Sequence, residues 1–170
     1  PTTHTRASPE RAPSKSPPAA LGWISAVRRG GTAEQALAAL ESALADGPVW
    51  VGPVEMGHLR HQPGMAGPIG ADHYVVVLGL GEGRVLMHDP QGHPYATLPV
   101  DDFVTAWRAE SVDYATPYTM RTAFRQLRDV SEEAAIEAAL PAARRWLSMA
   151  EGRHLPAGTI GNGAAAERLA

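Results

Sequence analysis

The chain of 170 residues contains no cysteine. This absence excludes disulfides, thiolate zinc sites and a cysteine nucleophile carried by these residues. No apolar run approaches the roughly 20 residues that span a bilayer, so we expect no membrane segment. Arg6, Arg11 and Lys15 precede no apolar stretch of the kind that a secretory signal requires. We therefore expect a cytoplasmic protein.

An excess of positive charge is also missing. The chain has 15 basic and 18 acidic residues, a formal net charge of −3. Nucleic-acid-binding proteins normally show a basic balance or stripe, so we expect no nucleic-acid partner. Hydrophobic residues make up 44% and charged residues 19% of the chain. This composition is typical of a globular domain that is long enough to bury one core.

Three regions differ in composition. Residues 1–20 contain five prolines and no apolar period, which predicts a disordered Pro-rich arm. Residues 21–128 hold alternating and continuous apolar runs that predict a sheet domain. Residues 129–170 predict a helical C-terminal segment, whose pattern is still running at Ala170.

The first half of the sheet domain alternates strands with one helix. Thr32, with Gln35 three residues later, forms the pattern of a capping box, and Gly47-Pro48 ends the helix that it opens. A three-residue hairpin loop is expected at Gly81-Glu82-Gly83. The other expected elements are strands at 21–27, 49–51, 74–80 and 84–88, with a Gly/Pro-rich loop over 52–70.

The second half predicts a short strand over 95–98, a helix over 100–107 and an extended or irregular segment over 114–124. Ser131 then caps a helix that runs to about Met149, with a kink or restart at Pro141. Together these elements predict an α+β fold with an antiparallel sheet and helices around it.

His73 and Asp89 are the candidate catalytic pair. His73 begins the strongest strand, and Asp89 ends the strand that returns from the hairpin. A three-residue loop centred on Glu82 places both side chains on one face, as diagonal neighbours at the open end of the hairpin. The carboxylate then accepts a hydrogen bond from one imidazole nitrogen, and the other nitrogen is free to act on a nucleophile.

These residues carry a resemblance to a known fold. The segments 72–79 (Asp-His-Tyr-Val-Val-Val-Leu-Gly) and 85–90 (Val-Leu-Met-His-Asp-Pro), followed by Leu98-Pro99, Phe103 and Ala106-Trp107, resemble the papain-like fold of bacterial double-glycine leader peptidases. They are still more similar to the N-terminal domain of the butirosin-biosynthesis acyltransferase family. In those families a histidine opens one strand and Asp-Pro closes the next. The resemblance covers roughly residues 22–147.

The resemblance implies a cysteine-peptidase-like acyltransferase or amide hydrolase in bacterial biosynthesis of the natural-product type. His73 is the base and Asp89 orients it. An acyl carrier protein or another thioester donor supplies the acyl group, and a small-molecule amine, a peptide or water accepts it. No cofactor is implied. The strong preference for arginine over lysine, 14 to 1, is typical of GC-rich coding and agrees with a bacterial source.

The family's cysteine is the point of departure. It is expected upstream of Leu21, where residues 1–20 contain none. Three explanations are open: the cysteine segment is absent from this chain, a partner supplies the nucleophile, or the protein is a non-catalytic binding or partner subunit of the same fold.

A metal-dependent enzyme is the second alternative, because five of the seven histidines lie between residues 58 and 93. However, His58 and His61 lie in the Gly/Pro-rich loop, where no helical register aims both rings at one ion. His88 alternates away from Asp89. We therefore expect solvated loop histidines and no metal site. The loop 52–70 is expected to be a wall or lid of a substrate cleft beside His73, or else a disordered insert.

Overall fold

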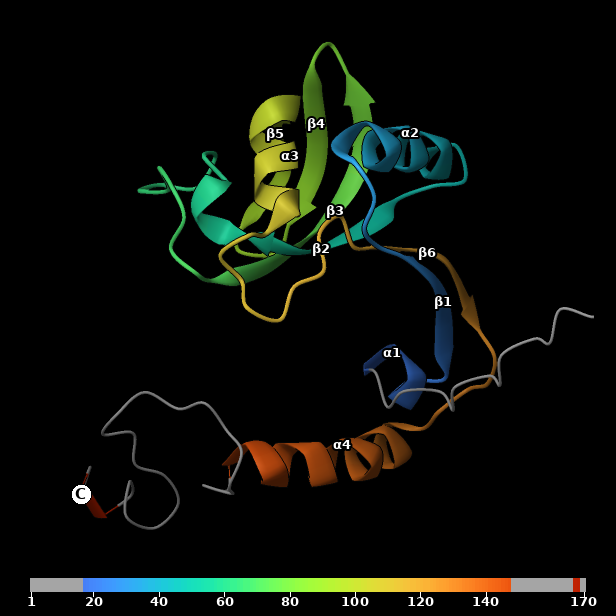
Figure 1. Ribbon diagram of the computed structural model, residues 1–170. Coiled ribbons are helices and arrows are strands. Elements are labelled where there is room, and N and C mark those ends of the chain that lie inside the picture. Colours follow the sequence, from blue (N-terminus) through green and yellow to red (C-terminus); the bar gives the residue numbers. More distant parts are fainter. Residues whose placement is uncertain (1–16, 148–166, 169–170) are drawn as a thin grey trace, which may run out of the picture. The chain divides into compact units, whose positions relative to one another are not determined.

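The computed structural model describes residues 17–147, 167 and 168 (Figure 1). It shows an α+β fold. In chain order the elements are α1 (Pro17–Ala20), β1 (Trp23–Arg28), α2 (Ala33–Leu44), β2 (Val49–Glu55), the 3-10 helix η1 (Met56–His58), β3 (Asp72–Gly81), β4 (Arg84–Asp89), β5 (His93–Pro99), α3 (Val100–Arg108), β6 (Met120–Gln126) and α4 (Glu132–Leu147).

The six strands form one sheet in the order β1-β6-β2-β3-β4-β5. The β2–β6, β2–β3, β3–β4 and β4–β5 pairs are antiparallel. Because β3, β4 and β5 are consecutive in the chain, tight turns suffice to join them. The α+β class and the predicted antiparallel sheet are thereby confirmed.

Both helices of the sheet domain begin where the sequence predicts. Thr32 Oγ1 accepts a hydrogen bond from Gln35 N, and Gln35 Oε1 accepts one from Thr32 N at 3.1 Å, which completes the capping box. Helix α3 carries Asp101 and Asp102 in its first turn, where the helix dipole favours negative charge.

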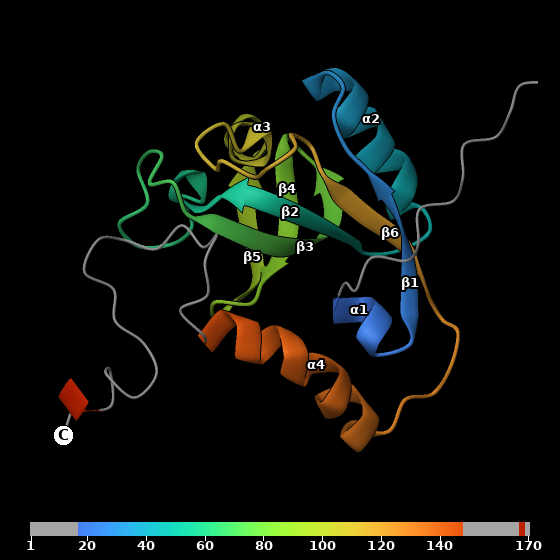
Figure 2. The same ribbon diagram turned by 60° about the horizontal axis from the view of Figure 1, so that its bottom comes forward.

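The hydrophobic core lies on the face of the sheet that α2 and α3 cover (Figures 1 and 2). Alternate residues of β3 and β4 point into it, because side chains on a strand alternate between faces. The largest fully buried apolar side chains are those of Trp107, Phe103, Leu40, Leu59, Met87 and Leu98.

The prediction for residues 52–70 was wrong at its start. Strand β2 continues to Glu55, and η1 follows it directly. The register of the β2–β3 pair shifts between Val51 and Val54. A shift of this kind tolerates Pro53, which has no N–H to give to the ladder. The segment 114–124, expected to be extended or irregular, contains the start of β6 at Met120.

The hairpin loop is shorter than the sequence predicts. Gly81 pairs with Arg84, so the loop consists of Glu82 and Gly83 alone. Their φ angles are 51° and 70°. Positive φ at both central residues is the mark of a type I′ turn, whose twist suits a two-residue hairpin.

The described residues divide into two compact units, residues 25–125 and a second unit that includes residues 17–24 and 126–147. In the second unit, Pro17–Ala20 form helix α1, although the sequence places them in the arm, and α1 contacts α4. Helix α4 runs through Pro141 to Leu147. The other arm residues, 1–16, and the predicted helix end at Met149 lie outside the described residues. No helix within the described part of the chain is long and apolar enough to cross a membrane.

Candidate active site

Asp89 is the last residue of β4 and is fully buried. Its carboxylate accepts four hydrogen bonds. Oδ1 accepts from His73 Nε2 at 2.8 Å and from Gln91 N at 2.9 Å. Oδ2 accepts from His61 Nε2 at 2.7 Å and from Gln62 Nε2 at 2.6 Å. These bonds occupy the roughly four acceptor positions of a carboxylate, two on each oxygen.

The predicted contact between His73 and Asp89 is confirmed. His73 is the second residue of β3, and its side chain is 9% exposed. Val76 pairs with His88 at this end of the hairpin. Since side chains alternate, this pairing puts His73 and Asp89 on the buried face and His88 on the other face, as expected.

His61 and Gln62 are site residues that sequence reasoning missed. Both lie in the loop after η1, and the expectation that His61 is a solvated loop histidine was wrong, because its side chain is 9% exposed. His93 also lies against it, with ring centroids 5.4 Å apart and planes at 82°. The loop therefore packs against Asp89 through the side chains of His61 and Gln62. The one available signal was that a buried aspartate needs more donors than one histidine.

Electrostatics keep Asp89 ionised. Burial alone would raise the pKa of its carboxyl, but the hydrogen bonds from Gln91, Gln62, His73 and His61 outweigh that effect and hold the pKa well below its ordinary value. An ionised carboxylate only accepts, so both imidazoles donate from Nε2. In the neutral form of each ring, Nδ1 then carries a lone pair.

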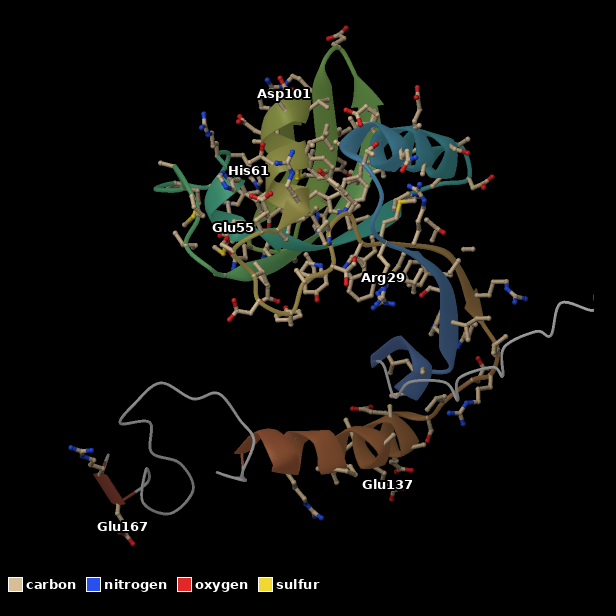
Figure 3. All side chains as sticks on the ribbon, in the orientation of Figure 1. Arg29, Glu55, His61, Asp101, Glu137 and Glu167 are labelled. Atoms are coloured by element: carbon tan, nitrogen blue, oxygen red, sulfur yellow. The ribbon has the colours of Figure 1, made fainter. Side chains whose placement is uncertain are left out.

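A second buried carboxylate, Glu55, fastens the loop to the end of β2. It is 1% exposed. Oε1 accepts from Gly57 N at 3.1 Å and Ile69 N at 3.0 Å, and Oε2 accepts from Gly70 N at 3.1 Å and from the Ser111 hydroxyl. Burial would raise the pKa of Glu55, but these bonds lower it. Figure 3 shows Glu55 and His61 at the same end of the sheet.

The loop also closes on itself at Gly57. Gly67 N donates to the Gly57 carbonyl at 3.0 Å. A Cβ atom at position 57 would collide with the Gly67 backbone. Glycine is therefore required here by close backbone approach, and the approach brings the two ends of the loop together.

A cavity of about 240 Å³ lies beside the Glu55 contacts. His58, Arg108 and Ser111 contribute to its lining. Asp89, His61 and His73 are not part of this lining, so His58 does not join their cluster. Within the described residues, no group of three or more His, Asp or Glu side chains is arranged to hold a metal ion.

Comparison with known proteins shows a likeness over part of the chain. No family model matches the chain. A segment of 75 residues is 35% identical to a Bacillus subtilis (strain 168) protein described as "Uncharacterized protein YobF". The segment is 44% of this chain and 24% of that protein, so the match spans about a quarter of the relative's length. This likeness assigns neither a family nor an activity.

Proposed function

We propose that His73 and Asp89 are the base and the orienting acid of a papain-like site for acyl transfer or amide hydrolysis. The observation that supports this role is the buried hydrogen bond of 2.8 Å between His73 Nε2 and Asp89 Oδ1. It leaves His73 Nδ1 as the nitrogen that meets a nucleophile. The nucleophile is a cysteine thiol from outside these 170 residues, which contain no cysteine.

The proposed reaction has two halves. His73 Nδ1 takes the thiol proton, and the thiolate attacks the carbonyl carbon of an acyl donor. The tetrahedral intermediate expels the donor's thiol or amine, which receives the proton from His73. An amine or water then attacks the acyl-enzyme while His73 takes its proton, and that proton returns to the cysteine sulfur as it leaves. Asp89 stabilises the imidazolium formed in each half.

The proposed substrates follow from this chemistry and from the resemblance. The donor is an acyl thioester, with an acyl carrier protein as the proposed partner. The acceptor is a small-molecule amine, a peptide or water. We place the reaction in bacterial biosynthesis of the natural-product type, in the cytoplasm and without a cofactor.

A second candidate function has its own supporting observation. Gln62 and His61 give Asp89 two donors from the loop after η1, so the same carboxylate also fastens that loop to β4. A binding or partner subunit without catalysis would keep this arrangement for structural reasons. In that case His73→Ala would change stability and leave catalysis in any complex unchanged.

The test uses the protein purified from its own source through an affinity tag. The preparation then retains any further segment of the same polypeptide and any partner protein that binds it. Fluorescent iodoacetamide at about pH 5 labels a thiolate held by an imidazolium much faster than an ordinary thiol. We expect a rapidly labelled cysteine and turnover of an acyl thioester. Turnover should fall about a hundredfold in His73→Ala.

His88→Ala is the matched control, because His88 is an exposed histidine of β4 on the opposite face from Asp89. It should leave labelling and turnover unchanged. A preparation with no reactive thiol, or one whose labelling and turnover are equal in wild type and His73→Ala, would contradict the proposal.

A further inference from the structure

Two histidines share one carboxylate, but their second nitrogens differ. His61 Nδ1 is buried and has no hydrogen-bond partner within the described residues. His73 Nδ1 also makes no hydrogen bond within the described residues, but it does not belong to the buried atoms that lack a partner. A second proton would therefore enter a different environment on each ring.

A proton added at Nδ1 creates a charged N–H donor. At His61 this donor would be buried with no acceptor, which is costly for a charged group. The proton is therefore placed better on His73, where the imidazolium keeps its contact with Asp89 at Nε2. The ring of His93 of β5 also packs against the His61 ring, and it offers no hydrogen bond to His61 Nδ1 within the described residues.

We propose that His61 is a positioning residue: it stays neutral and holds Asp89 through Nε2–H, while His73 is the histidine that takes the proton. This role rests on the proposed function, because it identifies which imidazole serves the nucleophile. Gln62 donates to the same Asp89 oxygen as His61. The two loop side chains thus keep Oδ2 occupied and direct Oδ1 toward His73.

The inference can be tested on the full chain alone by nitrogen-15 NMR of the histidine rings across a pH series. In the neutral state, both rings should show the Nε2–H tautomer. On acidification, His73 should be the first of the two to show protons on both nitrogens, while His61 keeps its Nε2–H tautomer. First protonation of His61, or an Nδ1–H tautomer of its neutral ring, would overturn the proposal.

Substitution of His61 distinguishes a role in holding Asp89 from a general contribution to folding stability. In folded His61→Ala, Asp89 loses one donor, and exchange of the His73 Nε2 proton with water should accelerate about tenfold. His61→Gln retains an amide donor and should restore part of this protection. His58→Ala is the matched control, since His58 lies in η1 and lines the neighbouring cavity. Unchanged exchange in His61→Ala would count against the role.

These measurements need no nucleophile. They can therefore support the assignment of His61 even if no reactive cysteine is found with the protein. Conversely, a thiol-dependent activity that requires His73 would support the proposed function. If His61 were protonated first in the same protein, this inference would be rejected while the proposed function stood.

Discussion

His61 and His73 donate to different oxygens of the same carboxylate, that of Asp89, at 2.7 and 2.8 Å. One histidine comes from a loop and the other from the second residue of β3. Asp89 therefore joins the loop, the hairpin and the candidate base in one buried cluster. Changes to this carboxylate should affect folding as well as any chemistry.

Asp89→Asn should lower stability by about 2–4 kcal/mol, because the amide nitrogen places a donor against two existing donors. The native carboxyl has a pKa well below its usual value, so its contribution to stability is present above the unfolded pKa of about 3.9 and is lost as pH falls below it. Urea denaturation at several pH values should show this acid loss in wild type and a flatter dependence in the variant.

Asp46→Asn is the control for that experiment, since Asp46 is an exposed residue just after α2. Its pH dependence should match that of wild type. If Asp89→Asn and wild type lost the same free energy between neutral and acidic pH, the buried carboxylate would not be the group responsible.

Glu55→Gln should destabilise the protein by about 2–3 kcal/mol. All four acceptor positions of Glu55 are occupied, by three backbone N–H groups and the Ser111 hydroxyl. Whichever oxygen becomes NH₂ therefore faces donors. Chemical denaturation of this variant beside Glu41→Gln, at an exposed position of α2, measures the difference. Equal stability of the two variants would mean that the loop is not fastened through Glu55.

The hairpin shows how the predicted contact between His73 and Asp89 forms despite a local error in the predicted turn. A three-residue loop is predicted, and the observed loop has two residues. A one-residue error normally moves side chains to the opposite face. Here the register shifts between Val77 and Gly79, so that Val77 still pairs with Met87. The irregularity offsets the shorter loop, and His73 and Asp89 meet on the predicted face.

The rest of the cluster was beyond prediction from the sequence for a physical reason. Strand alternation relates His73 to Asp89 through the β3–β4 pair, but no period relates Asp89 to His61, 28 residues earlier. That contact depends on how the loop folds over the sheet. The loop conformation depends in turn on Glu55 and on the close approach of Gly57 to Gly67. None of these contacts leaves a repeating pattern in the sequence.

Substitutions in the hairpin loop should have opposite effects. Glu82→Asn should stabilise the protein by about 0.5 kcal/mol, because asparagine tolerates the positive φ of 51° better than glutamate does. Gly83→Ala should destabilise it by about 1 kcal/mol, since φ is 70° and nothing lies within 4 Å of the added Cβ to compensate. Thermal unfolding of both variants measures these effects. A loss of stability in Glu82→Asn would argue against the type I′ turn.

Thr32→Ala should cost about 1 kcal/mol, because it removes the acceptor of Gln35 N and leaves a donor of the first helical turn without its cap. Thr32→Ser keeps the hydroxyl and is the matched control. Helix α2 supplies Leu40 to the core, so loss of the cap should be transmitted to global unfolding and not confined to fraying of the first turn. Urea denaturation followed by tryptophan fluorescence and by far-UV circular dichroism tests this. Coincident transitions at a lower midpoint would agree with the expectation, whereas an unchanged fluorescence midpoint would show that the cap stabilises the first turn alone.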